Sequence, residues 1–203
     1  MKLYYSPGAC SLSPHIALRE AGLPFDLVLA STKTKKLADG SDYLAINPKG
    51  QVPLLELDDG QRLTEGPAIV QYVADLVPEK KLAPPCGTMP RYRVMEWLNF
   101  VTSELHKGFS PLFVPTTPEE MKTQVRTRLG ERLSWVDREL EGREFLVGEN
   151  FTVADGYLFV VSGWGQHVNV DISGLKNLAS FRQRVAERPA VKAALQAEGL
   201  LKS

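Results

Sequence analysis

A cysteine near the N-terminus is the first residue of the chain with a clear capacity for chemistry. Cys10 follows a Pro-Gly pair and precedes a segment of helical character. A thiol at a helix start meets unpaired backbone N–H groups and the positive end of the helix dipole, which favour the nucleophilic thiolate. Ser13 completes a C-x-x-S pattern, in which no internal disulfide can form, so any redox cycle needs an external thiol. The alternative is a buried, inert cysteine, because cysteine is among the most buried residue types.

Two further motifs offer polar groups that could hold a peptide. Pro53 keeps Val52 extended, so the backbone N–H and C=O of Val52 can pair with another extended chain, and a cis bond would fix that geometry. Pro67 suits the first position of a helix, where the N–H of Gly66 could hold a carboxylate, while Glu65 could hold an ammonium group. The alternatives are an ordinary proline at the start of a strand and a glutamate that only stabilises the helix dipole.

A polar stripe in the second half of the chain is the third candidate. Asn99, Ser103 and His106 are spaced i, i+4 and i+7, which predicts one face of a helix. His106 could donate a hydrogen bond to a thiolate or transfer a proton near neutral pH, and Glu104 and Lys107 flank it. The alternative is a solvated helix face with a surface histidine.

The remaining histidines and cysteines give weaker signals. His15 and His167 lack comparable polar company, and we interpret both as structural. Cys10 and Cys86 are too few for a disulfide framework, and they lack the Cys/His clustering that a structural zinc site requires. We therefore expect no metal and two cysteines that stay reduced.

The segments that must position these groups differ between two parts of the chain. Up to residue 77, apolar patterning and turn residues predict β-α-β followed by β-β-α, over 2–5, 11–21, 25–30, 54–57, 61–64 and 67–76. The proline-rich stretch 78–88 suits a linker. Residues 89–203 show only helical spacing, over 91–109, 118–140, 153–168, 175–187 and 190–195. The predicted organisation is an α/β domain over 1–77 and an all-helical domain over 89–203. Thr152 and Asp155 form a predicted capping box.

Composition narrows the classes of partner. The chain has 203 residues, 43% of them apolar, with 24 basic and 24 acidic side chains. This balance argues against a surface that tracks phosphates, so we do not expect a nucleic-acid partner. No apolar stretch approaches the ~18 residues of a membrane span, and the N-terminus lacks a signal-peptide pattern. We expect a cytoplasmic protein that does not associate with a membrane.

Taken together, the motifs resemble the bacterial beta-class glutathione S-transferases. The resemblance rests on "YSPGACSLSPHIALREAG", "NPKGQVPLL", "LTEGPAIVQY", "WLNFVTSELHKGF" and "FTVADGYLF", which occur in the family's order and span nearly the whole chain. "GACS" with "SELHK" is typical of this class. The resemblance implies the glutathione transferase fold, a thioredoxin-like N-terminal domain plus an all-α domain, as a homodimer. It also implies glutathione (γ-Glu-Cys-Gly) as co-substrate.

By position, the resemblance assigns parts of glutathione to Cys10, to Val52 and to the pair Glu65 and Gly66. Cys10 would lie at the glutathione sulfur and could form a mixed disulfide with it. Val52, before a cis Pro53, would pair with the backbone of the cysteinyl residue. Glu65 and Gly66 would hold the γ-glutamyl end, although many relatives have serine in place of Gly66, which adds a hydroxyl contact.

The resemblance also assigns the remaining residues of the site. Lys35 would reach the glycine carboxylate, and His106 would lie near the thiol as the second catalytic residue beside Cys10. The same binding region would include residues of the polar helix segment, some of them across the dimer interface: Asn99, Ser103, Glu104 and Leu105.

Three functions follow from these assignments. The first is glutathione transfer to small hydrophobic electrophiles, a detoxification reaction. The second is glutathione-dependent thiol-disulfide exchange, peroxide reduction or reductive dehalogenation, with Cys10 as the nucleophile. The third is non-catalytic binding of apolar ligands on the same fold, because a fold does not fix a function.

Overall fold

The computed structural model describes residues 1–201, and these form two compact units. The first unit comprises Met1–Ala83 together with the chain from Arg188 onward, and the second comprises Pro84–Glu187. The C-terminal segment thus groups with the first unit, whereas the sequence predicts it within the all-helical domain. The physical reason lies in contacts between residues far apart in the sequence. One of them is a bidentate ion pair in which Arg188 donates two hydrogen bonds to the Glu20 carboxylate, at 2.6 and 2.9 Å.

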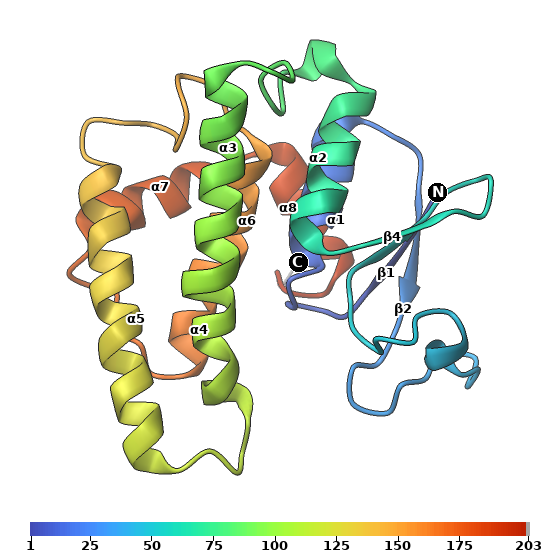
Figure 1. Cartoon of the computed structure of the whole chain (residues 1–203), viewed down its shortest axis with the longest axis horizontal. Helices are drawn as coiled ribbons and strands as arrows, with labels where there is room; N and C mark the ends of the chain where they lie inside the picture. The colour runs from blue at the N-terminus through green and yellow to red at the C-terminus, as the bar shows by residue number, and fades with distance from the viewer. Residues whose placement is uncertain (202–203) are drawn as a thin grey trace. The chain divides into compact units, whose positions relative to one another are not determined.

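A four-stranded mixed sheet forms the centre of the first unit, with the order β2-β1-β3-β4. β1 and β2 are parallel because α1 connects them, and the other two pairs are antiparallel. This is the predicted β-α-β, β-β-α arrangement. Figure 1 shows α1 and α2 on the same side of the sheet and α8 beside α1. The elements are β1 (Lys2–Tyr5), α1 (Leu12–Ala21), β2 (Asp26–Leu29), η1 (Tyr43–Ala45), β3 (Leu54–Glu56), β4 (Arg62–Thr64), α2 (Gly66–Leu76), η2 (Pro78–Lys80) and α8 (Pro189–Ala197).

The two faces of this sheet follow from the alternation of side chains along each strand. Leu3 is paired with Leu55 and Tyr4 with Leu54, and all four side chains are buried. Tyr4 and Leu54 share a core cluster with Tyr43, so their face is covered by the segment around η1. Leu3 and Leu55 therefore point to the opposite face, which α1 and α2 cover.

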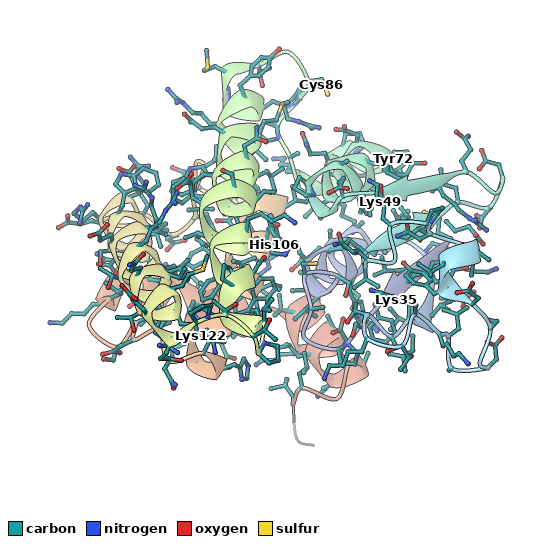
Figure 2. The ribbon with its side chains drawn as sticks, turned by 60° about the horizontal axis from the view of Figure 1, so that its bottom comes forward. Lys35, Lys49, Tyr72, Cys86, His106 and Lys122 are labelled. Carbon is teal, nitrogen blue, oxygen red and sulfur yellow. The ribbon has the colours of Figure 1, made fainter. Side chains whose placement is uncertain are left out.

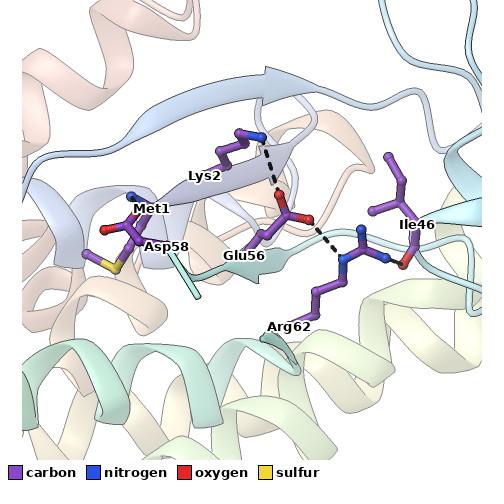
Figure 3. A network of polar contacts seen from close by, with 6 residues as sticks. All are labelled: Met1, Lys2, Ile46, Glu56, Asp58 and Arg62. Carbon is purple, nitrogen blue, oxygen red and sulfur yellow. Dashed lines mark hydrogen bonds and ion pairs between the residues drawn. The ribbon is translucent and has the colours of Figure 1, made fainter. Parts of the chain in front are cut away.

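Charged side chains connect the strands along the exposed part of the sheet (Figure 3). Glu56 accepts hydrogen bonds from Lys2 Nζ at 3.3 Å and Arg62 Nε at 2.9 Å, and Arg62 also donates to the Ile46 carbonyl at 2.9 Å. Burial opposes ionisation of Glu56, but the bonds and charges of Arg62 and Lys2 prevail and lower its pKa. The carboxylate thus holds β1, β3 and β4 together at neutral pH.

The second unit is helical, as predicted, with two local differences. The helix predicted over 91–109 is continuous but turns into a π-helix over Val101–His106. The helix predicted over 153–168 ends at Ser162 and continues as a 3-10 helix, because Gly163 and Gly165 have low helix propensity. The elements are α3 (Met89–Phe100), η3 (Val101–His106), α4 (Lys107–Phe109), η4 (Ser110–Phe113), α5 (Glu119–Glu139), α6 (Val153–Ser162), η5 (Gly163–His167) and α7 (Lys176–Ala186).

Helix α6 is buried along its whole length. Apart from Asp155 near its start and Ser162 at its end, its residues are mostly apolar, as expected for a helix in the middle of a bundle. The predicted capping box of Thr152 and Asp155 is present at its start. Within residues 1–201, no helix is both long and apolar enough to cross a membrane.

Candidate active site

Cys10 lies in a turn before α1 and is partly buried. Its thiol donates to the carbonyl oxygen of Val52 at 3.3 Å, and the Val52–Pro53 peptide bond is cis. The structure thus brings together the first two predicted motifs and confirms the cis bond. A thiol proton suits this carbonyl, but a thiolate there would place two negative centres side by side. Formation of the thiolate therefore requires other donors to replace the carbonyl contact.

A buried carboxylate from the C-terminal segment holds the turn that carries Cys10. Glu198 accepts from the N–H of Gly8 at 3.0 Å and contacts His15 Nδ1 at 2.8 Å. Arg19 Nε donates to His15 Nε2 at 2.8 Å, so that nitrogen has no proton and Nδ1 must donate to Glu198. His15 is therefore neutral, with its proton on Nδ1. The local pattern around His15 gives no sign of this partner, because Glu198 lies 183 residues away.

Glu65 and Gly66 lie at the start of α2, as predicted. Glu65 has a φ of 70°, an uncommon backbone conformation for a residue with a side chain, and the kind that clusters at ligand sites. Its carboxylate is 70% exposed and pairs with Lys49 Nζ at 2.7 Å, a residue that the sequence analysis missed. An exposed pair contributes only about 0–1 kcal/mol, so a ligand can replace either partner at little cost. A Cβ at Gly66 would meet only Pro53 Cγ at 4.0 Å, so packing leaves room for the family's serine.

Lys35 is the second cation on this part of the first unit. Its Nζ donates to the carbonyl of Gly50 at 2.6 Å, and its own backbone has a φ of 57°. Gly50 follows Lys49 directly, so both lysines act on the short turn that precedes Val52. Figure 2 labels Lys35 and Lys49 in the first unit. The turn thus presents two ammonium groups, which suits a ligand with more than one carboxylate.

The polar stripe of the second unit lies partly in the π-helix. A π-helix has more residues per turn than the α-helix that the spacing assumed, so the three polar residues do not form one regular face. Asn99 and Ser103 are exposed, and Ser103 Oγ donates to the Asn99 carbonyl at 3.0 Å. Leu105 has no exposed surface and packs in the core, so its side chain offers nothing to a ligand.

Glu104 lies against α5, where it accepts from Arg128 at 3.1 Å and from Arg132 at 2.9 Å. The hydrogen bond from Arg128 is the main cause of the lowered pKa of Glu104, against a smaller opposing effect of burial. The carboxylate is therefore already satisfied by two guanidinium groups of its own unit. This arrangement favours a structural role for Glu104 in joining the π-helix to α5.

His106, labelled in Figure 2, has a buried tyrosine and an aromatic surface as neighbours. Its Nδ1 lies 2.6 Å from the Tyr157 hydroxyl, and its ring meets Trp164 edge to face at 4.9 Å. Trp164 also contacts Phe109 and Phe113, and Phe113 is 50% exposed. This surface can accept an apolar molecule beside the imidazole. Tyr157, Trp164 and Phe113 were not among the predicted site residues, since their spacing is that of core residues.

A cavity of about 620 Å³ lies elsewhere in the second unit, between α3 and α5. Its aromatic wall comprises Trp97, Phe100 and Trp135, and none of the predicted site residues lines it. The charged residues at this cavity pair with each other, since Arg93 binds Glu96 at 2.7 Å and Arg143 lies 3.9 Å from Glu139. In the described part of the chain, no cluster of three or more His, Cys, Asp or Glu residues could hold a metal ion.

Comparison with known families and proteins adds independent evidence. Residues 8–76 match the family model of the glutathione S-transferase N-terminal domain, and residues 100–189 match that of the C-terminal domain. Glutathione S-transferase GstA of Escherichia coli O157:H7 is 53% identical over 200 residues, covering 98% of this chain and all of that protein. Glutathione S-transferase GST-4.5 of Xanthomonas campestris is 43% identical, with the same coverage.

Solved structures agree with these sequence relatives. The ternary complex of BphK, a bacterial glutathione S-transferase, has a TM-score of 0.96 at 60% identity, covering 98% of this chain and 100% of that one. A beta-class enzyme from Sphingomonas chungbukensis has a TM-score of 0.96 at 50% identity, covering 99% and 100%. The fold, the contact of the Cys10 thiol with Val52 beside a cis proline, and the relatives all point to one family. The chain belongs to the bacterial beta class of the glutathione S-transferase family and is a glutathione transferase.

Proposed function

We propose that this protein binds glutathione on its first unit and transfers it to small hydrophobic electrophiles. The observation that carries the proposal is the 3.3 Å contact between the Cys10 thiol and the Val52 carbonyl, next to the cis peptide bond. A peptide that pairs with the backbone of Val52 brings its own cysteinyl side chain to Cys10. A sphingomonad relative of 47% identity, with a TM-score of 0.95, was solved in complex with glutathione.

The charges around this contact support glutathione as the peptide. Glutathione carries two carboxylates and one ammonium group. Glu65 is proposed to take the ammonium group, the N–H of Gly66 the adjacent carboxylate, and Lys35 the glycine carboxylate. Lys49 can release Glu65 for this purpose, because the pair is exposed and weak.

Residues of the second unit complete the proposal. His106 is proposed to donate a hydrogen bond to the glutathione thiolate, and the electrophile to rest on the surface of Trp164 and Phe113. We also propose a homodimer, with Asn99 and Ser103 among the residues near the interface, because both are exposed on the second unit. Sedimentation of the intact protein would measure the oligomeric state.

The chemical step is a substitution by sulfur. Near neutral pH only a few per cent of a thiol with a pKa of ~8.5 is ionised, so the site must stabilise the thiolate. The glutathione sulfur forms a bond to the electrophilic carbon, the leaving group departs with its electron pair, and the thiol proton goes to solvent. Cys10 undergoes no change in this reaction.

Cys10 itself supports a second candidate, glutathione-dependent thiol-disulfide exchange. It is partly accessible and lies in a C-x-x-S turn, so its thiolate could attack a disulfide and a glutathione thiol could resolve the product. Peroxide reduction and reductive dehalogenation would use the same pair of thiols.

The substitution Cys10→Ser separates these activities, with Cys86→Ser as the control because Cys86 is the other cysteine and is exposed. We expect aryl halide conjugation to survive in Cys10→Ser while reduction of a mixed disulfide with glutathione disappears. Loss of both activities with glutathione binding intact would refute conjugation by glutathione alone. Tight glutathione binding without any turnover in the unmodified protein would favour a non-catalytic binding protein.

A further inference from the structure

Tyr157 places a hydroxyl in the middle of a buried helix whose neighbouring residues Leu158, Phe159 and Val160 are apolar. The residue is 2% exposed, lies in the middle of α6, and has buried neighbours throughout the helix. Burying a hydroxyl is costly unless it forms a hydrogen bond, so phenylalanine would be the simpler residue here. The hydroxyl lies 2.6 Å from Nδ1 of His106, a contact between residues 51 positions apart.

The chemistry of the two groups sets the direction of this hydrogen bond. A phenol is an acid with a pKa of ~10, and the unprotonated nitrogen of an imidazole is a base whose conjugate acid has a pKa of ~6.5. The natural pairing is therefore O–H donating to N. The short distance also suits a hydroxyl donor, since N–H···O bonds are typically ~2.9–3.0 Å.

A second contact fixes the plane of the imidazole. The ring meets Trp164 edge to face, with an angle of 74° between planes, and meets the Tyr157 ring at 80°. His106 is also the last residue of the π-helix, a local feature found often at functional sites. The hydrogen bond from Tyr157 and these near-perpendicular aromatic contacts thus help to hold the ring in place.

We propose that Tyr157 is a positioning residue: its hydroxyl donates to His106 Nδ1 and so keeps the imidazole proton on Nε2. The N–H at Nε2 is then the donor for the glutathione thiolate. The assignment of the tautomer rests on the short contact and on the chemistry of the two groups, and the role of the N–H toward the thiolate rests on the proposed function. His15 provides a natural contrast, since Arg19 and Glu198 fix its proton on Nδ1 instead.

Nitrogen NMR of the 15N-labelled full chain tests the tautomer without any activity measurement. The chain has three histidines, so single His→Gln variants assign the ring signals. At neutral pH we expect His106 to show an unprotonated Nδ1 and a protonated Nε2, and His15 to show the reverse. In Tyr157→Phe we expect the His106 signals to move toward an average of both tautomers. A protonated Nδ1 on His106 in the unmodified protein would overturn the proposal.

Kinetics with glutathione and an aryl halide test the consequence for catalysis. We expect Tyr157→Phe to lower kcat about 10-fold with the KM for glutathione within about 2-fold, as for an interaction that matters mainly in the transition state. In a His106→Asn background the same substitution should have no further effect, because Tyr157 acts through the imidazole. Tyr92→Phe, an exposed tyrosine of the same unit, is the matched control.

Each other outcome of the kinetics counts against the positioning role. An unchanged kcat, a higher KM alone, or an equal additional loss in the His106→Asn background would contradict it. If the unmodified protein shows no turnover, the proposed function fails while the NMR result still decides the tautomer. The failures of the two proposals are therefore distinguishable.

Discussion

Asp155 combines a structural role with an unusual acidity, and this makes the stability of the protein depend on pH. The carboxylate has no exposed surface and accepts from the N–H of Leu146 at 2.8 Å, the N–H of Thr152 at 2.7 Å and the Thr152 hydroxyl at 2.9 Å. Burial raises the pKa of Asp155 to about 6, although these hydrogen bonds act in the opposite direction. The folded protein therefore holds this proton more strongly than the unfolded chain does.

The sign and size of the effect follow from proton linkage. With a pKa of about 6 in the folded state against 3.8 in the unfolded state, the contribution of Asp155 to stability is fully present below pH 3.8. It is lost as the pH rises through 6. The total change is about 3 kcal/mol at ~1.4 kcal/mol for each pKa unit, and roughly half of it falls between pH 5 and 7.5.

Urea unfolding at pH 5, 6, 7 and 7.5 measures this change when Asp155→Asn, which cannot ionise, is compared with the unmodified protein. We expect the stability of the unmodified protein, relative to Asp155→Asn, to fall by about 1.5 kcal/mol across this range. At an m value of about 3 kcal/mol per molar, the difference in urea midpoint between the unmodified protein and Asp155→Asn would change by about 0.5 M over this pH range. Asp171→Asn is the control, because Asp171 accepts from the backbone of Ser173 in an exposed turn. A difference that stays constant with pH, or that moves in the other direction, would refute the reasoning.

Two further predictions concern the first turn and the glycines. Glu198→Ala removes the carboxylate that accepts from the Gly8 N–H and from the buried Nδ1–H of His15, so we expect a loss of about 3 kcal/mol in urea unfolding and a changed rate of Cys10 alkylation. Unchanged alkylation would contradict the role of Glu198 in holding the turn. Gly50→Ala should destabilise by about 1–2 kcal/mol, because φ is 61° and a Cβ would lie 2.9 Å from a leucine methyl. Gly130 lies in the middle of α5, and a Cβ there would meet no atom within 4 Å, so Gly130→Ala should stabilise the protein by about 1 kcal/mol. Equal effects of the two glycine substitutions in urea unfolding would contradict this prediction.

The elements that local patterns determine could be predicted well. The strands and helices of the first unit follow from period-2 and period-3.6 spacing, and the capping box of Thr152 and Asp155 needs only four consecutive residues. The cis bond at Val52–Pro53 was also expected, although through the family resemblance rather than from the local pattern alone.

Features that depend on distant contacts could not be predicted in this way. Nothing in the sequence near His15 points to Glu198, and nothing near Glu65 singles out Lys49 among the neighbouring lysines. The π-helix likewise has no local signature, so the predicted helical face placed His106 in register with Asn99. Long-range pairs decide these details, and a single sequence does not reveal them.

The position of Glu198 and helix α8 late in the sequence also determines when the first unit can finish folding during synthesis. Protein synthesis delivers residues 1–83 first, yet the unit that they form is completed only by the segment from Arg188 onward. Domains usually fold in the order of their synthesis, but here the thiol-bearing unit must wait until the all-helical unit has emerged from the ribosome. A stop codon at position 198 would remove Glu198, and the damage would fall on the turn that carries Cys10, although Gly8 and Glu198 lie 190 positions apart.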